Sequence, residues 1–372
     1  MHIKRLSLIN FKNYEEAELE LSPAVNCFVG DNGSGKTNIL DAIHYLSVCK
    51  SYFNPIDSQN VRHEEGFFVL QADVSVEDET DRVHCGVKKG EKKTFKRNDK
   101  EYSRLADHIG RFPSVIITPN DTDLIREGSE VRRKFIDGII SQLNRSYLDN
   151  LIKYNKVLLQ RNNLLKHFAA ERRFDAENLA IWTDKLVELG IPIEQERRAF
   201  MERFTPIFST FYQKISGGVE EGGLRYKSNF SPEEFASELL AAQDKDCALQ
   251  RTTIGPHKDD VVFLLGDHPV KKLGSQGQQK SFLIALKLAQ FQFVKEAKGV
   301  MPWLLLDDVF DKIDDKRVAY LMELVSENQF GQIFITDTHK VRVPDLFKAA
   351  NKEVRVFEVE KGKITSNQKE AV

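Results

Sequence analysis

The stretch Val25–Leu46, VNCFVGDNGSGKTNILDAIHYL, decides the fold. Its middle part, GDNGSGKT from Gly30 to Thr37, fits the phosphate-binding loop pattern GxxxxGK[ST]. The residues VNCFV before the loop predict a strand, and TNILDAIHYL after it predicts a helix whose apolar face carries Ile39, Ala42, Ile43 and Leu46. Because the loop stands between a strand and a helix, we interpret it as a nucleotide site rather than a chance glycine-rich turn.

The residues of this loop suit different parts of a nucleoside triphosphate. The glycines let backbone N–H groups converge on phosphate oxygens, which a Cβ atom would obstruct. Lys36 is predicted to reach the β- and γ-phosphates, and the Thr37 hydroxyl to bind Mg²⁺. We therefore predict that the whole loop binds the nucleotide, through Gly30, Asp31, Asn32, Gly33, Ser34, Gly35, Lys36 and Thr37.

A second motif, PWLLLDD, places two carboxylates at the end of a predicted strand, Trp303–Leu306. Ligands bind at the carboxyl ends of strands in parallel sheets. Asp307 is predicted to hold Mg²⁺, directly or through water, and Asp308 to polarise the attacking water. Two acids at a strand end are on their own better explained as solvated turn residues, but beside a phosphate loop they indicate a catalytic site.

A third motif, LGSQGQQKS at Leu273–Ser281, lies directly before the helical run FLIALKLAQFQFV. A helix start offers free backbone N–H groups and the positive end of the helix dipole, and here a serine adds a hydroxyl. One nucleotide has no need of two phosphate-binding devices from one chain. We therefore predict that Ser275, Gly277 and Gln278 contact the nucleotide of a second copy, so that a homodimer encloses ATP.

Apolar strands alternate with helices at both ends of the chain, which predicts an α/β fold with a mixed, largely parallel sheet. We expect residues 1–128 and 250–372 to form one two-part ATPase head, which includes the strand VVFLL at 261–265. Residues 129–249 are expected to form a helical arm that contains an antiparallel helix pair. Pro192 and Pro206 should kink or interrupt the second helix of that pair.

Composition narrows the choice of function only slightly. The 372 residues show no signal peptide and no apolar run near the ~18–20 residues that a bilayer requires, so a cytoplasmic protein without a membrane partner is expected. Four dispersed cysteines without a CxxC pair argue against a zinc site or a disulfide framework. The net charge of −2 is uninformative, and the basic cluster Lys88–Arg104 indicates either part of a nucleic-acid surface or a solvated hairpin.

The three motifs resemble those of ABC-type ATPases in type and order: phosphate loop, GSQGQQK as the signature motif, and LLLDDVFDKID with Asp314 as the D-loop residue. Within that superfamily the chain most resembles the RecF family. The resemblance rests on IKRLSLINFKNYEEAELEL, on the block from TPNDTDLIREG to LLQRNNLL, and on TTIGPHKDDVVF, and covers nearly the whole chain. It implies an ABC-type head with an inserted helical arm.

The resemblance also implies a function. RecF proteins are ATP-dependent DNA-binding dimers that hydrolyse ATP slowly. They act with RecO and RecR at gapped, partly single-stranded DNA and help to load RecA. The chain departs from the ABC pattern at Asp308, where a glutamate is usual. The expected place of the switch histidine falls near Asp337, two residues before His339, and Gln59 is a candidate for the Q-loop residue.

Other functions remain open at this stage. An SMC-like clamp outside the RecFOR pathway is the main alternative, although an SMC protein would need much longer coiled coils. A transporter ATPase subunit would lack the inserted arm, and an ATPase-coupled nuclease would need a further C-terminal domain. The protein is also expected to act chiefly as a DNA-binding clamp in which ATP hydrolysis serves as a timer.

Overall fold

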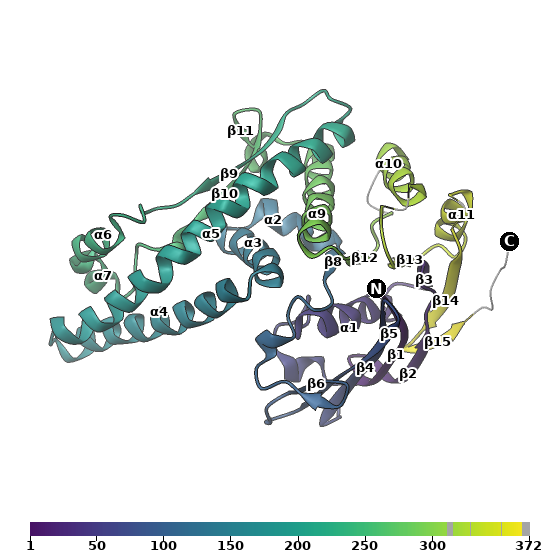
Figure 1. Cartoon of the computed structure of the whole chain (residues 1–372), viewed down its shortest axis with the longest axis horizontal. Helices are drawn as coiled ribbons and strands as arrows, with labels where there is room; N and C mark the ends of the chain where they lie inside the picture. The colour runs from purple at the N-terminus through teal and green to yellow at the C-terminus, as the bar shows by residue number, and fades with distance from the viewer. Residues whose placement is uncertain (311–314, 328, 351, 367–372) are drawn as a thin grey trace. The chain divides into compact units, whose positions relative to one another are not determined.

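The computed structural model describes residues 1–310, 315–327, 329–350 and 352–366 (Figure 1). The chain divides into two compact units. The first, called the head below, contains Met1–Asp121 and the chain from Leu283 onward, and the second, called the arm, contains Thr122–Phe282. The chain leaves the head after Asp121 and re-enters it within helix α9 (Gln276–Lys298).

The central sheet of the head joins strands from distant parts of the chain. Its order is β15 (Lys363–Ser366), β14 (Val354–Glu360), β3 (Val25–Val29), β13 (Ile333–Asp337), β12 (Trp303–Leu306) and β8 (Ser114–Ile117). The strands from β14 to β8 are parallel, and β15 runs antiparallel to β14. The carboxyl ends of β3, β12 and β13 therefore meet at one edge, where the phosphate loop and the acidic pair begin.

Both faces of this sheet are covered, which explains why its strands are apolar throughout. Phe28 of β3 belongs to one hydrophobic cluster with residues of helix α1 (Lys36–Val48) and of a second sheet. Its neighbours Cys27 and Val29 belong to a different cluster on the opposite face, with residues of α9, α10 (Asp315–Ser326) and α11 (Arg342–Ala349). The alternation follows from the two-residue period of a strand.

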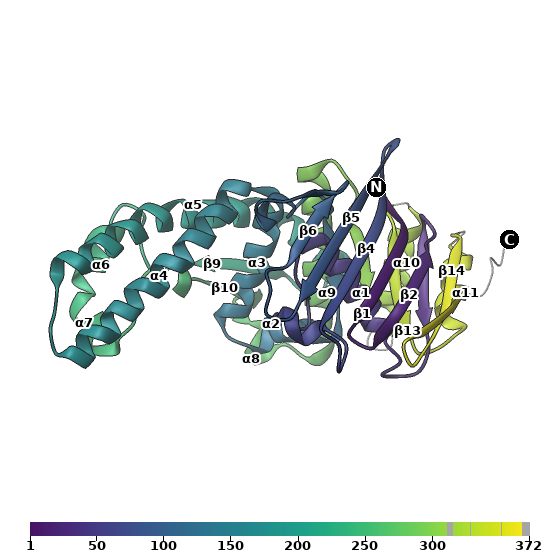
Figure 2. The same ribbon diagram turned by 90° about the horizontal axis from the view of Figure 1, so that it is seen from below.

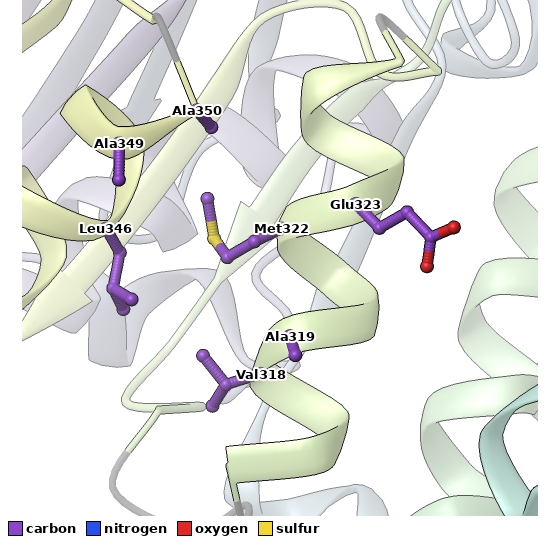
Figure 3. Close-up of a pocket in the computed structure, with 7 residues that line it drawn as sticks. All are labelled: Val318, Ala319, Met322, Glu323, Leu346, Ala349 and Ala350. Atoms are coloured by element: carbon purple, nitrogen blue, oxygen red, sulfur yellow. The ribbon is translucent and has the colours of Figure 1, made fainter.

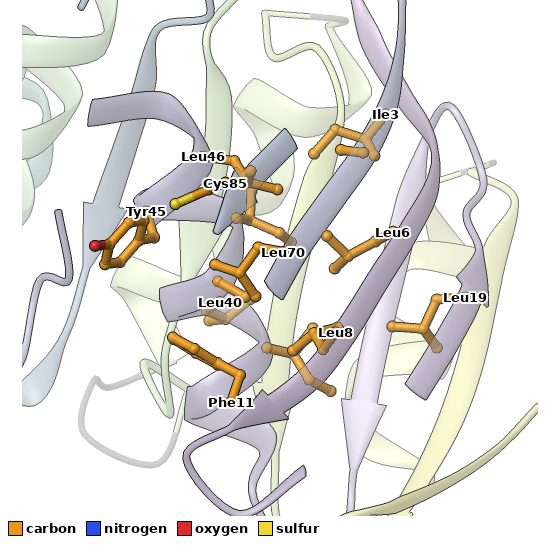
Figure 4. Packing of buried hydrophobic residues seen from close by; sticks show 14 of the residues in the cluster. Ile3, Leu6, Leu8, Phe11, Leu19, Leu40, Tyr45, Leu46, Leu70 and Cys85 are labelled. Carbon is orange, nitrogen blue, oxygen red and sulfur yellow. The ribbon is translucent and has the colours of Figure 1, made fainter. Parts of the chain in front are cut away.

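The second sheet of the head is antiparallel (Figure 2). Its order is β2 (Tyr14–Glu20), β1 (His2–Phe11), β4 (Phe67–Val76), β5 (Glu79–Lys88), β6 (Thr94–Arg97) and β7 (Lys100–Glu101). Leu6, Leu8 and Leu70 on its inner face share a hydrophobic cluster with Leu40 and Leu46 of α1 (Figure 4). Short turns join β1 to β2 and β4 to β5, and such turns favour antiparallel pairing. Among the strands that the structure describes, parallel pairing is thus confined to the central sheet.

The arm contains the predicted helix pair, α4 (Arg145–Glu171) and α5 (Ala176–Ser216), which lie side by side (Figure 1). Helix α5 is continuous through Pro192 and Pro206, so the expected interruption does not occur. A proline inside a helix costs about 3 kcal/mol. Here Ile193, Phe200 and Phe204 are buried, and their tertiary packing offsets that cost.

The rest of the arm is built from short elements. The helices are α2 (Asp123–Arg126), α3 (Ser129–Leu143), α6 (Phe235–Ala241), α7 (Gln243–Leu249) and α8 (Val270–Leu273). A small antiparallel sheet has the order β11 (His268–Pro269), β10 (Asp260–Leu265) and β9 (Gly222–Lys227). The VVFLL strand, expected in the parallel sheet, is thus part of β10 and pairs with a hairpin partner, β11.

Two buried arginines hold the TTIGPHKDD segment within the arm. Arg161 donates from Nη1 to Asp246 at 2.7 Å and to Thr252 at 2.8 Å. Arg197 donates from Nη1 to the carbonyl of Pro256 at 2.6 Å and to Asp259 at 2.9 Å. A buried charge is tolerated only when it is paired and hydrogen-bonded. This sequence block therefore fixes the internal structure of the arm.

Candidate nucleotide site

The phosphate loop has a backbone that glycine alone accommodates at two positions. Gly30 has φ of 155°, and a Cβ atom on it would lie 2.2 Å from the carbonyl oxygen of Val359. Gly35 has φ of 118°, and its Cβ would lie 2.4 Å from Nδ2 of Asn13. Both φ values favour glycine, and both contacts are shorter than van der Waals distance. The loop glycines are thus required by the backbone itself.

Groups distant in sequence hold the loop in place. Asn13 donates from Nδ2 to the carbonyl of Ser34 at 2.9 Å, and the Tyr14 hydroxyl donates to the carbonyl of Gly35 at 3.0 Å. The backbone N–H of Gly362 also donates to the Ser34 carbonyl, at 3.0 Å. Sequence reasoning missed these residues because they lie in the β1–β2 turn, at the start of β2 and in the β14–β15 turn, none of which matches a motif.

Lys36 is folded into the loop. Its Nζ donates to the backbone carbonyls of Gly30 at 2.7 Å and Asp31 at 2.9 Å, and the residue is only 4% exposed. A phosphate oxygen is a stronger partner for an ammonium group than a carbonyl, because the hydrogen bond is then charge-assisted on both sides. The buried ammonium is therefore available to exchange carbonyl partners for phosphate oxygens.

The Thr37 hydroxyl meets the carboxylate of Asp307 across the sheet edge. Thr37 donates to Oδ1 of Asp307 at 2.7 Å, and Thr336 donates to the same oxygen at 2.9 Å. Thr336 in turn accepts the backbone N–H of Asp308 at 2.9 Å. The loop, β12 and β13 thus contribute to one hydrogen-bonded cluster, and its carboxylate and hydroxyl oxygens are ligands that suit Mg²⁺.

Asp307 is electrostatically disfavoured as a carboxylate. Burial raises its pKa above the ordinary value, and the negative charge of Asp308 adds to the effect. The hydroxyls of Thr37 and Thr336, together with the charge of Lys36, oppose the shift without cancelling it. A divalent cation between Asp307 and Thr37 would relieve this penalty, so the residues fit the predicted metal site.

Asp308 has a left-handed backbone, with φ of 46°. This conformation is uncommon outside glycine and costs of order 1–3 kcal/mol, and such outliers cluster at functional sites. The predicted role of Asp308 toward the attacking water stays a prediction.

The end of β13 lies beside the loop in the sheet, because Asp337 pairs with Val29. Asp337 is 1% exposed and bridges to Arg342 at 2.9 Å. Its Oδ1 also accepts the backbone N–H of His339 at 2.8 Å, and the His339 side chain is exposed. His339 therefore follows the correct strand for a nucleotide sensor, and that role stays a prediction.

The predicted roles of Gln59 and Asp314 stay predictions. Gln59 is exposed in a short 3₁₀ helix, η1 (Asp57–Asn60), where its Oε1 accepts from Asn54 at 2.9 Å. The predicted D-loop residue, Asp314, lies outside the described residues.

A buried ion pair at the same sheet edge was not predicted. Lys287 of α9 contacts Oδ1 of Asp121 at 2.7 Å, and both side chains are almost fully buried. The Tyr52 hydroxyl donates to the same carboxylate oxygen at 2.7 Å. Asp121 lies in the 3₁₀ helix η3 (Pro119–Thr122) that follows β8, so the pair ties α9 to the segment after this strand. An acid and a base that lie far apart in the sequence form no local pattern from which their pairing could be predicted.

The signature residues belong to the arm, at the start of α9. The Ser275 hydroxyl accepts the backbone N–H of Gln278 at 3.2 Å, and the Gln278 Oε1 accepts the backbone N–H of Ser275 at 2.6 Å. This reciprocal pair is a capping box. Ser275, Gly277 and Gln278 thus form an ordered helix start, and their contact with a second copy's nucleotide stays a prediction.

Several residues of the basic cluster Lys88–Arg104 are paired with carboxylates, so fewer of them can bind the phosphates of a nucleic acid than the charge of the cluster suggests. Lys93 bridges to Asp57 at 2.8 Å, and Arg97 bridges to Asp81 at 2.9 Å. Lys88 is paired with Glu91. Of the other lysines in the cluster, Lys92 and Lys100 are exposed and Lys96 is half-buried. The choice between a nucleic-acid surface and a solvated hairpin now rests on these residues.

A separate apolar pocket of about 530 Å³ lies between α10 and α11 (Figure 3). It is lined by Val318, Ala319, Met322, Glu323, Leu346, Ala349 and Ala350. Its one carboxylate, on Glu323, points away from α11 (Figure 3). The lining residues include no cation for a phosphate, so this pocket gives no reason to move the predicted nucleotide site away from the loop.

The fold and the cluster of Thr37 with Asp307 define the class: the head of an ABC-type ATPase. Residues 2–365 match the family model of the RecF/RecN/SMC N-terminal domain. SMC heads share the fold at low identity, as in an SMC head bound to the winged-helix domain of ScpA, at a TM-score of 0.56 and 16% identity.

Closer relatives specify the family. The DNA replication and repair protein RecF of Flavobacterium johnsoniae is 50% identical over 357 residues, which covers 96% of this chain and 99% of the relative. RecF of Phocaeicola vulgatus is 48% identical over the full length of both chains. A structure of the recombination mediator protein RecF with ATP has a TM-score of 0.90 at 29% identity, covering 98% of this chain and 97% of that one. The chain belongs to the RecF family of DNA replication and repair proteins.

Throughout the part of the chain that the structure describes, no helix combines the length and apolarity needed to cross a membrane.

Proposed function

We propose that this protein binds DNA in an ATP-dependent manner, as a dimer that closes around two ATP molecules. The observation that carries the proposal is the carboxylate of Asp307, held between the hydroxyls of Thr37 and Thr336 beside the phosphate loop. Lys36 would bind the β- and γ-phosphates, and Asp307 with Thr37 would hold Mg²⁺, which supplies positive charge against the phosphates. Asp308 would accept a proton from the attacking water.

The second half of each site would come from the other copy. The capping box at Ser275 and Gln278 leaves an ordered helix start that suits an anion. We propose that Ser275, Gly277 and Gln278 contact the nucleotide bound by the partner. Slow hydrolysis would then open the dimer and act as a timer for its release from DNA.

The family supports a place in recombinational repair. A RecF of similar structure is described as a recombination mediator of the RecFOR pathway. By extension, we propose that this protein binds gapped DNA, where single and double strands meet, and acts with RecO and RecR to help load RecA. The likeness to SMC heads supports the fold alone and favours no separate function.

Sedimentation velocity with and without Mg·ATP tests this proposal. The protein should form a dimer with ATP, and gapped duplex DNA should stabilise that dimer. Ser275→Arg should bind ATP as a monomer with unchanged affinity but should not dimerise, because the arginine would fill the place of the partner's phosphate. If this variant forms an ATP-dependent dimer as the parent does, the signature motif has no role in trans.

A further inference from the structure

The signature motif has a contact that the proposed function does not explain. In the capping box, the side-chain oxygen Oε1 of Gln278 accepts the backbone N–H of Ser275. The side-chain amide of Gln278 is therefore the group with which this residue can donate to a nucleotide. That amide already donates, from Nε2 to Oε1 of Glu220, at 2.5 Å.

The long arm helix and the strand after it fix the position of Glu220. Its second oxygen, Oε2, accepts the hydroxyl of Tyr212 at 2.9 Å. Tyr212 is fully buried and packs on Phe208 and Phe282. Its ring fills the space beside Gly222, where a Cβ atom would lie 2.5 Å from the ring. Both carboxylate oxygens of Glu220 are thus engaged by groups that the end of α5 and the start of α9 hold in place.

A carboxylate at this point opposes the binding of a nucleotide. The bond between this amide and the carboxylate is charge-assisted and short, and it takes one of the two N–H groups of Gln278 Nε2. A phosphate or ribose oxygen must therefore displace the carboxylate or bind the remaining N–H directly beside it. The carboxylate would also lie within a few Å of the phosphates, and like charges repel strongly where water is excluded. A residue that only oriented Gln278 would not need a charge.

We propose that Glu220 is a latch on the signature motif, which holds the Gln278 amide until the nucleotide of a second copy displaces it. This inference rests on the proposed role of the signature motif in trans. The latch makes dimer closure weaker than the contacts of the motif would allow, so the dimer opens readily. It also links closure to the arm, because Tyr212 at the end of α5 sets the place of the carboxylate.

Neutralising Glu220 tests the latch. Glu220→Gln keeps the size of the side chain but removes the charge. Its carbonyl oxygen can still accept the Gln278 amide, and its Nε2 can donate to the Tyr212 hydroxyl. The dimer dissociation constant should be measured by sedimentation with Mg²⁺ and a slowly hydrolysed ATP analogue. We expect the variant to dimerise about tenfold more tightly than the parent, which corresponds to about 1.4 kcal/mol. Thermal unfolding without nucleotide should show that the fold is unchanged.

Glu221→Gln is the matched control, because Glu221 is the adjacent residue and carries the same charge on an exposed side chain. It should dimerise as the parent does, which would show that the effect is not a general change of charge. Tyr212→Phe leaves Glu220 charged but removes one of its anchors. This variant should fall between the parent and Glu220→Gln.

The outcomes separate the latch from the function on which it rests. An equal or weaker dimer for Glu220→Gln would overturn the latch, since the carboxylate would then be neutral to closure or needed to position Gln278. Ser275→Arg should be combined with Glu220→Gln in the same assay. If the double variant still forms an ATP-dependent dimer, the role of the signature in trans is wrong. If it does not dimerise, that role stands whatever the result for Glu220 alone.

Discussion

Asp307→Asn should make the protein more stable without nucleotide while greatly weakening its stabilisation by Mg·ATP. The two hydroxyls that bind Asp307 both donate to Oδ1. The single carbonyl oxygen of asparagine can accept both bonds, so the variant keeps the cluster and loses only the charge.

The magnitude follows from two opposing effects. A hydrogen bond to a charged group contributes about 1.5–3 kcal/mol and one to a neutral group about 0.5–1.5 kcal/mol, so the two bonds together lose roughly 2 kcal/mol. Removing a buried charge recovers several kcal/mol of desolvation. Because the pKa of Asp307 is raised despite its hydrogen bonds, the charge is a net penalty in the folded state. We expect a net stabilisation of about 1–2 kcal/mol, or a rise of roughly 2–8 °C in Tm.

The pH dependence has a definite sign. A carboxyl whose folded pKa is raised binds its proton more tightly in the folded than in the unfolded protein. The penalty is therefore full at neutral pH and disappears as the pH falls through the folded pKa toward the ordinary value of 3.8. The stability advantage of Asp307→Asn should accordingly be largest near pH 7 and shrink as the medium is acidified.

Calorimetry at neutral and mildly acid pH, with and without Mg·ATP, measures both effects. At a nucleotide concentration 100 times the dissociation constant, the free energy of unfolding of the parent should rise by about 2.7 kcal/mol. That of the variant should rise much less. Asp337→Asn is a matched control, because Asp337 ends the neighbouring strand and is paired with Arg342. It should destabilise the protein. A loss of stability in Asp307→Asn like that in Asp337→Asn would refute the electrostatic reasoning.

Three further predictions concern the nucleotide and DNA. Lys36→Met should weaken ATP binding about 10–100-fold, the loss of one charge-assisted contact, as titration calorimetry can measure, and unchanged affinity would contradict the loop assignment. Asp308→Asn should bind ATP normally but turn it over at least about 100-fold more slowly and persist on DNA, whereas turnover at the parent rate would move the base elsewhere. Replacing Lys92 and Lys96 with Glu should weaken binding to all DNA sequences alike and reduce the salt slope by about 2, and an unchanged slope would identify a solvated hairpin.

Much of the head could be predicted from the sequence, because its signals are local. The phosphate loop was recognisable from its glycines, from the strand before it and from the helix after it. These three signals all lie within Val25–Leu46. The aspartates after β12 were recognisable for the same reason. Contacts between distant segments could not be predicted, since Asn13 and Gly362 meet the loop only in the folded sheet.

The arm shows where local rules fail. Pro192 and Pro206 predicted a kinked or interrupted helix. Helix α5 is not interrupted, because burial of one face outweighs the lost backbone bonds. The strand at 261–265 was assigned by its apolar run, and periodicity cannot distinguish a parallel partner from a hairpin partner. A list of charges likewise cannot show that Lys93 and Arg97 already have carboxylate partners.

The most direct test of a shared nucleotide site is to mix two inactive variants. Lys36→Met has a defective loop and an intact signature, and Ser275→Arg has the reverse. A mixed dimer would contain one complete site, formed by the loop of one copy and the signature of the other, and one site with both defects. Sedimentation with a fluorescent ATP analogue should therefore show no nucleotide-bound dimer for either variant alone, and one nucleotide per dimer for the mixture. If the mixture fails to dimerise, or if one variant alone dimerises around the nucleotide, the loop and the signature do not share a site between copies.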